Sequence, residues 1–348
     1  MALAASVEAE DGGFELLYAD TLRFFPDLVT ELGGDPAALL RQLGLDPSIF
    51  QRGAGLSYRS MIELLELAAA ELRAPDFGMR LAARQGGGKV FGIMGVVMKN
   101  SATFGDALAY VVDHIYAHSL AARMRCERDR ARQRLFVGYE ILLDRLPDPR
   151  QAIEQALLLA HLNAAEITGG QARVREVRFR RQPLSPLRTY RDYFGCEVRF
   201  DQAEDGVVYG EQDLASPIVE PDEQLYEMAT TFIDARFTRV TPPMHAQVRG
   251  LILQHLGEAA CTNDRVAAEL CLHPRTLHRR LKAEGKSFEA IKDEVRRDVA
   301  LRYLRQTDLP LTRIAEKLGY AETSVLSRSC YRWFGVSPRQ LRARPGAA

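Results

Sequence analysis

Two short stretches near the C-terminal end carry cationic and hydroxyl side chains at helical spacing. Within 274–284 the basic residues recur every three or four positions, and within 322–334 Ser324, Arg328 and Arg332 are spaced by four. Arg can donate two hydrogen bonds to a guanine edge, and Ser or Thr can contact bases or phosphates. The candidate DNA-contacting residues are His273, Arg275, Thr276, His278, Arg279, Lys282, Thr323, Ser324, Ser327, Arg328 and Arg332.

The first stretch has the neighbours of a helix-turn-helix unit. Thr262 is the expected N-cap of a preceding helix, whose small apolar face lies within 266–270. A short turn through 271–273 follows, and Pro274 opens the next helix. In such a unit one helix crosses the phosphate backbone and the other enters the major groove. The pattern therefore predicts a DNA-binding unit over 262–285.

A second unit of the same kind begins about fifty residues later. Thr312 is its expected N-cap, residues 314–318 carry the apolar face, and the turn follows at Gly319. The second helix of this unit is expected to run from Glu322 and to end at Gly335. The sequence thus predicts, inside its last hundred residues, two helices that would enter the major groove, which we call the reading helices.

A continuous helix is predicted between the two units. The segment that begins at Phe288 has about 18 residues at helical spacing, which span roughly 27 Å at about 1.5 Å per residue. Successive major grooves on one face of DNA lie about 34 Å apart. We expect this helix to hold the two reading helices about one DNA turn apart.

The distribution of charge agrees with this interpretation. The whole chain has 46 basic and 46 acidic residues, but residues 241–348 hold 19 Lys or Arg and 11 Asp or Glu, a net charge of +8. The remaining 27 basic and 35 acidic residues give the rest of the chain a net charge of −8. Such asymmetry is typical of a polyanion-binding module joined to one that does not bind polyanions.

The N-terminal region mixes helices and strands without a regular βαβ rhythm, which predicts an α+β fold. Asp35 and Thr103 are the expected N-caps of two helices, 121–142 indicates two strands around a charged turn, and a helix ends at Gly169. The Pro pair at Pro242 marks the expected start of the helical part. The predicted division is an α+β N-terminal effector and dimerisation domain over 1–215, a connecting helix and linker over 216–243, and an all-α domain with two helix-turn-helix units joined by a long linker helix over 244–345.

The last hundred residues closely resemble the DNA-binding domain of AraC/XylS-type transcription regulators. The matching segments read HPRTLHRRLKAEGKSF, DVALRYLRQTDLPLTRIAEKLGY and YRWFGVSPRQLR, in the same order and register across the whole domain. Two upstream segments resemble more loosely the arabinose-binding-like N-terminal domain of one branch of that family: GIMGVVMKNSATFGDALAYVVDHI and YRDYFGCEVRFDQAEDGVVYGEQDLASPI.

The resemblance implies a regulator that binds double-stranded promoter DNA and activates or represses a promoter. Its N-terminal domain is then expected to bind a small-molecule effector, which the sequence does not identify. A homodimer is expected to form through the helix near 222–237, and RNA polymerase is a further candidate partner. The resemblance implies no enzymatic activity and no cofactor.

Four positions depart from the family pattern. Cys271 stands where a turn glycine is usual, and His273 stands where a Ser N-cap is usual. Leu326 and Cys330 stand where aromatic residues are usual. All four belong to turns or to the packed side of the units, so we expect the outward face to be preserved.

The remaining features favour a cytoplasmic protein without a metal centre. The five cysteines are widely spaced with no CxxC pair, the N-terminal stretch lacks a signal-peptide pattern, and no apolar run is long enough to span a membrane. His114 and His118 are expected one helical turn apart, which could ligate a metal ion, but no third ligand is evident. The glycine run 86–88 does not fit a phosphate-binding loop.

Two alternatives stay open at this point. The first is a constitutive DNA-binding protein whose N-terminal domain only dimerises. The second is an enzyme that the C-terminal domain localises on DNA, although no activated nucleophile, carboxylate pair or cofactor loop in the sequence supports it.

Overall fold

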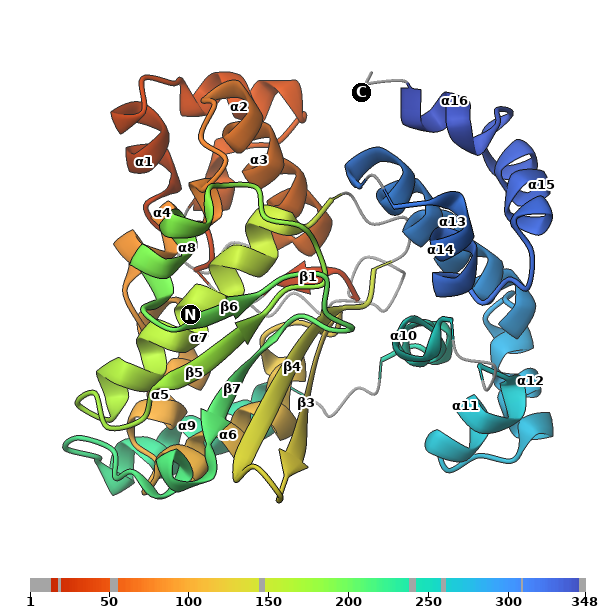
Figure 1. Cartoon of the computed structure of the whole chain (residues 1–348). Helices are drawn as coiled ribbons and strands as arrows, with labels where there is room; N and C mark the ends of the chain where they lie inside the picture. The colour runs from red at the N-terminus through yellow and green to blue at the C-terminus, as the bar shows by residue number, and fades with distance from the viewer. Residues whose placement is uncertain are drawn as a thin grey trace. The chain divides into compact units, whose positions relative to one another are not determined.

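The computed structural model describes residues 14–17, 20–50, 56–143, 148–237, 242–257, 261–307 and 309–343, so the N-terminal stretch discussed above lies outside it. The chain divides into two compact units (Figure 1). One lies within residues 1–141 and 147–241, and the other within 142–146 and 242–348. Among the described residues, every strand belongs to the first unit, and 242–343 contain only helices and their connections. The predicted α+β and all-α classes are therefore confirmed.

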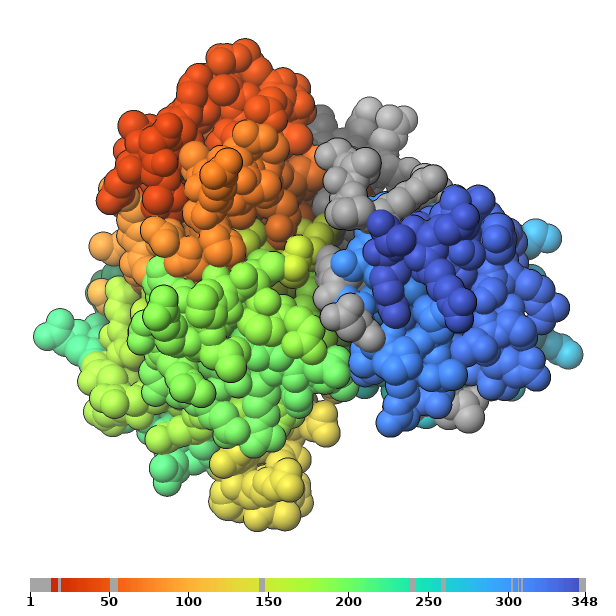
Figure 2. Space-filling model, turned by 45° about the horizontal axis from the view of Figure 1, so that its top comes forward, coloured from red at the N-terminus to blue at the C-terminus, as the bar shows by residue number. Residues whose placement is uncertain are grey.

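A five-stranded sheet forms the centre of the first unit, in the order β3-β4-β7-β5-β6. Neighbouring strands are antiparallel except β5 and β6, which are parallel. The strands β3 and β4 confirm the predicted pair within 121–142 and form a projecting hairpin (Figure 2, yellow). The strands are β3 Ala122–Asp129, β4 Arg134–Ile141, β5 Val174–Arg178, β6 Glu197–Arg199 and β7 Gly206–Gly210, and a separate small sheet pairs β1 Leu16–Leu17 with β2 Leu56–Ser57.

The two faces of the main sheet differ in chemistry, because successive side chains of a strand point to opposite sides. Val137 of β4 is in register with Val207 of β7, and both line an internal cavity. Their neighbours Phe136 and Val208 are also in register, and they lie on the opposite, charged face.

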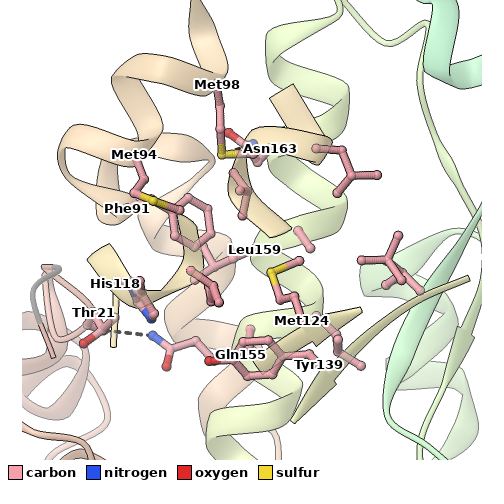
Figure 3. Close-up of a pocket in the computed structure, with 18 of the residues that line it drawn as sticks. Thr21, Phe91, Met94, Met98, His118, Met124, Tyr139, Gln155, Leu159 and Asn163 are labelled. Atoms are coloured by element: carbon pink, nitrogen blue, oxygen red, sulfur yellow. Dashed lines mark hydrogen bonds between the residues drawn. The ribbon is translucent and has the colours of Figure 1, made fainter. Parts of the chain in front are cut away.

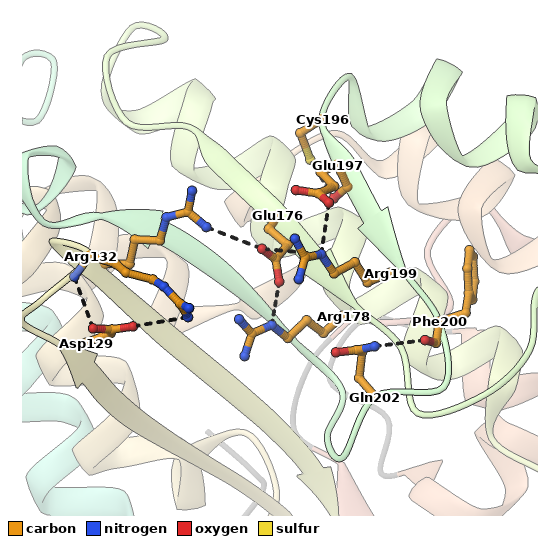
Figure 4. A network of polar contacts seen from close by, with 10 residues as sticks. Asp129, Arg132, Glu176, Arg178, Cys196, Glu197, Arg199, Phe200 and Gln202 are labelled. Atoms are coloured by element: carbon orange, nitrogen blue, oxygen red, sulfur yellow. Dashed lines mark hydrogen bonds and ion pairs between the residues drawn. The ribbon is translucent and has the colours of Figure 1, made fainter.

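A network of ion pairs ties the strands together on the charged face (Figure 4). Glu176 of β5 is only 1% exposed and contacts Arg178 at 2.6 Å, Arg134 of β4 at 3.4 Å and Arg199 of β6 at 3.8 Å. Arg199 also contacts Glu197 at 2.9 Å. A buried carboxylate without cationic partners would be strongly destabilising, so these arginines fix the positions of three strands.

Helices pack on the cavity side of the sheet, and α7 contacts both β5 and β7. The expected caps are confirmed: the Asp35 side chain accepts from the Ala37 N–H at 2.9 Å, and Thr103 forms a capping box with Asp106. The long helix α7 ends just before Gly169, whose φ of 61° is left-handed. The helices are α1 Phe25–Glu31, α2 Pro36–Gln42, α3 Tyr58–Glu71, α4 Phe77–Gln85, α5 Ile93–Lys99, α6 Phe104–His114, α7 Arg150–Ile167, α8 Leu187–Phe194 and α9 Glu223–Arg236.

The second unit is built around α13, which confirms the predicted long helix between the two helix-turn-helix units. It runs for 19 residues and contacts α10, α14, α15 and α16. In the part of the chain that the structure describes, none of the helices combines the length and apolar character that a membrane crossing requires. The helices are α10 Met244–His255, α11 Asn263–Glu269, α12 Pro274–Ala283, α13 Phe288–Gln306, α14 Leu311–Lys317, α15 Thr323–Phe334 and α16 Pro338–Ala343.

Candidate DNA-binding surface and ligand cavity

The first helix-turn-helix unit consists of α11 and α12. Thr262 caps α11 as predicted, because its hydroxyl accepts from the Arg265 N–H at 3.3 Å. Val266 and Ala267 of α11 are buried together with Leu277 and Leu281 of α12. Because Leu277 and Leu281 are four residues apart, they lie on one side of α12, which packs in the core, and the opposite side faces solvent.

The turn of this unit accommodates both departures from the family pattern. Cys271 has a φ of 54°, in the left-handed region where glycine is favoured. His273 is the N-cap of α12, and its Nδ1 accepts from the Arg275 N–H at 3.2 Å. The imidazole therefore performs the capping role of the usual serine, which ties this ring to the helix terminus.

The outward side of α12 is strongly basic. Arg275, His278, Arg279 and Lys282 are all exposed, at spacings of three and four. Arg275, Arg279 and Lys282 form no ion pair with any described residue. Thr276, which is also a predicted contact on this helix, is half-buried. Three cations thus stand on one helix face with their donors available to a ligand.

The second unit consists of α14 and α15. Ile314, Ala315 and Leu318 are buried as the apolar pattern predicts. The predicted cap at Thr312 is wrong: α14 begins at Leu311, and the extended residue before it is Pro310, which provides no side-chain cap. Proline fixes the backbone at the helix entrance, so Thr312 lies inside the first turn and is exposed.

The positions Leu326 and Cys330, where aromatic residues are usual in the family, lie on the inner side of α15. Both are completely buried. Burial raises the pKa of the Cys330 thiol to about 11, so the thiol stays protonated and packs as a small apolar group. The change from aromatic residues therefore alters the core of this unit, as expected, and does not affect its outward side.

The outward side of α15 carries fewer available cations than that of α12. Ser324, Arg328 and Arg332 are exposed, whereas Thr323 and Ser327 are half-buried. Arg328 has no ion pair within the described part of the chain.

The second cation on this side, Arg332, is held by α13. Its guanidinium pairs with the Asp293 carboxylate, to which the Trp333 Nε1–H also donates at 2.9 Å. Sequence reasoning missed this contact because the two residues are 39 positions apart.

Sequence reasoning also missed Tyr331. Its side chain is 56% exposed on α15 between the two arginines. The available signal was its spacing of three residues from Arg328, which places both on one helix face. An exposed aromatic ring with a hydroxyl can contact sugar, phosphate or an apolar base edge.

The first unit contains an internal cavity between the inner face of the sheet and α3, α5, α6 and α7 (Figure 3). The space open to the centres of water molecules is about 100 Å³, several times the roughly 10–15 Å³ that one water needs. Met94 and Met98 of α5, Met124 of β3 and Leu159 of α7 supply apolar walls. Thr21, Gln155 and Tyr139 lie together at one end, and Asn163 lies at the other beside Met98 (Figure 3).

Several polar atoms of the cavity lining have no hydrogen-bond partner among the residues that the structure describes. They are the hydroxyl of Thr21, Nδ1 of His118 and Oδ1 of Asn163, all buried. Burial lowers the pKa of His118 to about 4, so its imidazole is neutral at pH 7. Buried polar groups normally have partners, so these three atoms indicate a cavity suited to a ligand.

The structure changes the expectation for His114 and His118. The α-helix ends at His114, a 3-10 turn at Ile115–Ala117 follows, and His118 lies beyond it. His114 Nδ1 contacts the Tyr110 carbonyl at 2.9 Å, while His118 faces the cavity. The predicted common helix face is therefore wrong. The described residues contain no group of three or more His, Cys, Asp or Glu that could hold a metal ion.

Comparison with known proteins agrees with this architecture. Residues 33–218 match the family described as the N-terminal arabinose-binding domain of AraC transcription regulators, and residues 266–344 match a helix-turn-helix domain. The second match covers α12 to α16 and therefore both reading helices.

Similar full-length proteins are transcription regulators. The chain is 36% identical to the HTH-type transcriptional regulator VirS of Mycobacterium tuberculosis over 334 residues, and this alignment covers 96% of this chain and 98% of that protein. It is 26% identical over 331 residues to the ornithine utilization regulator of Pseudomonas aeruginosa, with coverage of 94% and 96%. The crystal structure of the regulator CdpR from Pseudomonas aeruginosa is 21% identical, with a TM-score of 0.44 over 91% of this chain and 98% of that chain. The two family matches and the similarity to VirS confirm the resemblance seen in the sequence. The chain belongs to the AraC-type family of DNA-binding transcription regulators, which are not enzymes.

Proposed function

We propose that this regulator binds promoter DNA by placing α12 and α15 in two successive major grooves, under the control of an effector held in the first unit. The observation that carries this proposal is the position of both reading helices in one compact unit, connected through α13. The 19 residues of α13 span about 28 Å, close to the groove repeat of about 34 Å. The protein would act in the cytoplasm, with RNA polymerase as a further candidate partner.

The proposed contacts follow from exposure and pairing. Arg279 and Arg328 are exposed, unpaired among the described residues and central on their helices, so we assign them to base edges. The remaining predicted residues would position the protein on phosphates or add weaker base contacts. These are His273, Arg275, Thr276, His278, Lys282, Thr323, Ser324, Ser327 and Arg332, to which we add Tyr331.

Effector control is supported by contacts that connect the wall of the cavity to α9. Met94 and Met98 of α5 line the cavity, and α5 packs against α9. At the end of α5, Asn100 Oδ1 accepts from the Asp222 N–H, the N-cap of α9, at 2.9 Å. A ligand that favours one position of α5 would therefore bias the position of α9.

The exposed side of α9 supports a homodimer. Leu225, Met228 and Phe232 are 45%, 68% and 48% exposed, and their spacing places them on one face. Large apolar side chains grouped in this way usually mark an interface. A second copy fits well, because an antiparallel pairing of two α9 helices would bring the acidic first turn of each close to the basic last turn of the other.

The dimer is tested with the double variant Met228→Glu/Phe232→Glu. We expect sedimentation velocity to show a dimer for the wild type and a monomer for the variant, because charges would be buried at the interface. The control Glu227→Lys changes the charge at an exposed position more than a quarter turn from both residues and should leave the dimer intact. A wild type that sediments as a monomer at micromolar concentration would contradict this part of the proposal.

DNA binding and effector control are tested separately. Chromatin immunoprecipitation of the intact protein should identify bound promoters, and a purified promoter fragment should be shifted in a gel. Output from such a promoter should then change when the effector is supplied. If promoter binding and output are the same under all growth conditions, the constitutive alternative is correct and effector control is wrong.

A further inference from the structure

We propose that the cavity of the first unit binds an uncharged, mainly hydrocarbon molecule that carries a hydroxyl or carbonyl oxygen. This assignment rests on the proposed effector control and specifies the chemical class of the effector. It is based on the residues that line the cavity and on the polar atoms there that have no hydrogen-bond partner within the described ranges.

The lining excludes a charged ligand. Of the described residues that line the cavity, none is Asp, Glu, Lys or Arg. His118 is only 8% exposed and its lowered pKa keeps it neutral, so it offers no positive charge. Transfer of an ionised carboxylate or ammonium into such surroundings is very unfavourable without a charged partner. Amino acids and ionised organic acids therefore do not suit this cavity.

The apolar walls fit a hydrocarbon body of adaptable shape. Four of the eight methionines of the chain line the cavity, namely Met61, Met94, Met98 and Met124. Because methionine is unbranched and polarisable, it can repack around ligands of different shape. Phe91 provides an aromatic wall beside His118, with ring centroids 6.3 Å apart. Dispersion and burial of apolar surface would supply most of the binding free energy.

The polar atoms without a partner are the reason why the proposed ligand carries a hydroxyl or carbonyl oxygen. The buried Thr21 hydroxyl and His118 Nδ1 have no hydrogen-bond partner in the described part of the chain. The Gln155 Nε2 group is already occupied, because it donates to the Thr21 carbonyl and to Gln85 Oε1, each at 2.9 Å. The hydroxyls of Tyr58 and Tyr139 bond to each other. A ligand hydroxyl or carbonyl could satisfy the Thr21 or His118 atom, which removes the cost of an unmade hydrogen bond.

The charge preference is tested with matched probe pairs on the intact protein at pH 7.5. The pairs are 1-octanol with octanoate and 4-propylphenol with 4-propylbenzoate. We expect the neutral member of each pair to raise the Tm and to bind at least tenfold more tightly than its ionised partner in calorimetry. If the ionised member binds equally or better, the proposed class is wrong, while effector control can still be correct.

The location is tested by filling the cavity. Ala156 and Ala160 of α7 both line it, so Ala156→Leu and Ala160→Leu should each weaken binding of 4-propylphenol at least tenfold. The control Ala70→Leu changes an exposed position of α3 outside the cavity and should bind normally. Circular dichroism and promoter binding without ligand show whether each variant is folded. Full binding by both folded cavity variants would overturn the location.

The hydrogen bond is tested with a probe that lacks oxygen. 4-Propylphenol should bind at least threefold more tightly than propylbenzene, and His118→Phe, which keeps a ring but removes Nδ1, should reduce that ratio. A wild-type ratio of one would overturn the oxygen requirement. If no neutral probe binds the wild type, the ligand class is wrong, and promoter output in cells, compared between wild type and Ala156→Leu, reports on effector control independently.

Discussion

The two helix-turn-helix units have the same plan but hold their cations differently. On α12, Arg275, Arg279 and Lys282 are exposed and make no ion pair with described residues. On α15, Arg332 is paired with Asp293 of α13, so of its two predicted cations Arg328 alone has no ion pair with a described residue. From this difference we propose that the first helix-turn-helix unit would supply more of the electrostatic affinity for DNA, whereas the second would depend on one arginine and on polar contacts.

The turns of the two units differ as well. Both require a residue with positive φ, which is Cys271 at 54° in the first unit and Gly319 at 69° in the second. A side chain at such a position is strained by about 1 kcal/mol or more, whereas glycine is not. The first helix-turn-helix unit therefore combines the more basic surface with the less favourable turn.

The largest predicted effect comes from the basic side of α12. The triple variant Arg275→Ala/Arg279→Ala/Lys282→Ala should bind its promoter at least about 100-fold more weakly, and the slope of log affinity against log salt should fall by about 2–3. Fluorescence anisotropy over a salt series measures both. A matched control, Arg41→Ala/Arg188→Ala/Arg191→Ala, removes three exposed charges from the N-terminal α+β unit and should keep the wild-type slope. Equal slopes for all three proteins would contradict the role of α12.

The next largest effect is expected at Arg328. Replacement by Ala should cost about 1–3 kcal/mol of binding free energy if this side chain reads a guanine. The loss should be specific to one base pair, so a promoter with that pair changed should bind wild type and variant equally. Gel shifts at fixed salt measure the difference. An unchanged affinity on the natural promoter would remove Arg328 from the contacts.

A smaller effect is expected at Arg332, because its guanidinium is already paired with Asp293. Arg332→Ala should reduce affinity by less than about threefold, in line with a partly screened surface pair. Asp293→Asn should instead increase affinity for DNA several-fold, since it releases Arg332 and still offers an oxygen to Trp333. If Arg332→Ala costs more than Arg328→Ala, the contrast between the two units is wrong.

The smallest effect concerns the turns. Cys271→Gly should increase the free energy of unfolding by up to about 1 kcal/mol, and Gly319→Ala should decrease it by about 1 kcal/mol. An added Cβ at Gly319 would have no neighbour closer than 3.5 Å, so the loss would come from the backbone rather than from a clash. Urea unfolding of the intact protein measures both changes. A stabilising Gly319→Ala would contradict this reasoning.

Local features of both compact units could be predicted from the sequence because they depend on short-range chemistry. Thr262, Asp35 and Thr103 form the caps expected of them, and the apolar spacing located α11 to α15. The error at Thr312 has a local cause, since Pro310 is the N-cap and the helix therefore begins two residues earlier. Helix boundaries are decided by such competition between neighbouring residues.

Long-range features could not be predicted. The contact of Arg332 with Asp293 joins two helices, and the exposure of Tyr331 depends on what packs beside α15. The cavity is formed by segments as distant as Thr21 and Val207. Its polar atoms come together only through the sheet register and the packing of α7, and no spacing within one segment indicates either. The ligand class therefore depends on the structure.

The most direct test is a footprint of one protein on one promoter. Methylation protection of guanine N7 and hydroxyl-radical cleavage together show which grooves are occupied and on which face. For each bound chain we predict two protected major-groove clusters with centres about 10–10.5 base pairs apart, on the same face of the duplex, and loss of one cluster in the α12 triple variant. A single protected cluster, or two clusters separated by about half a helical turn, would contradict the proposal that both reading helices bind successive grooves.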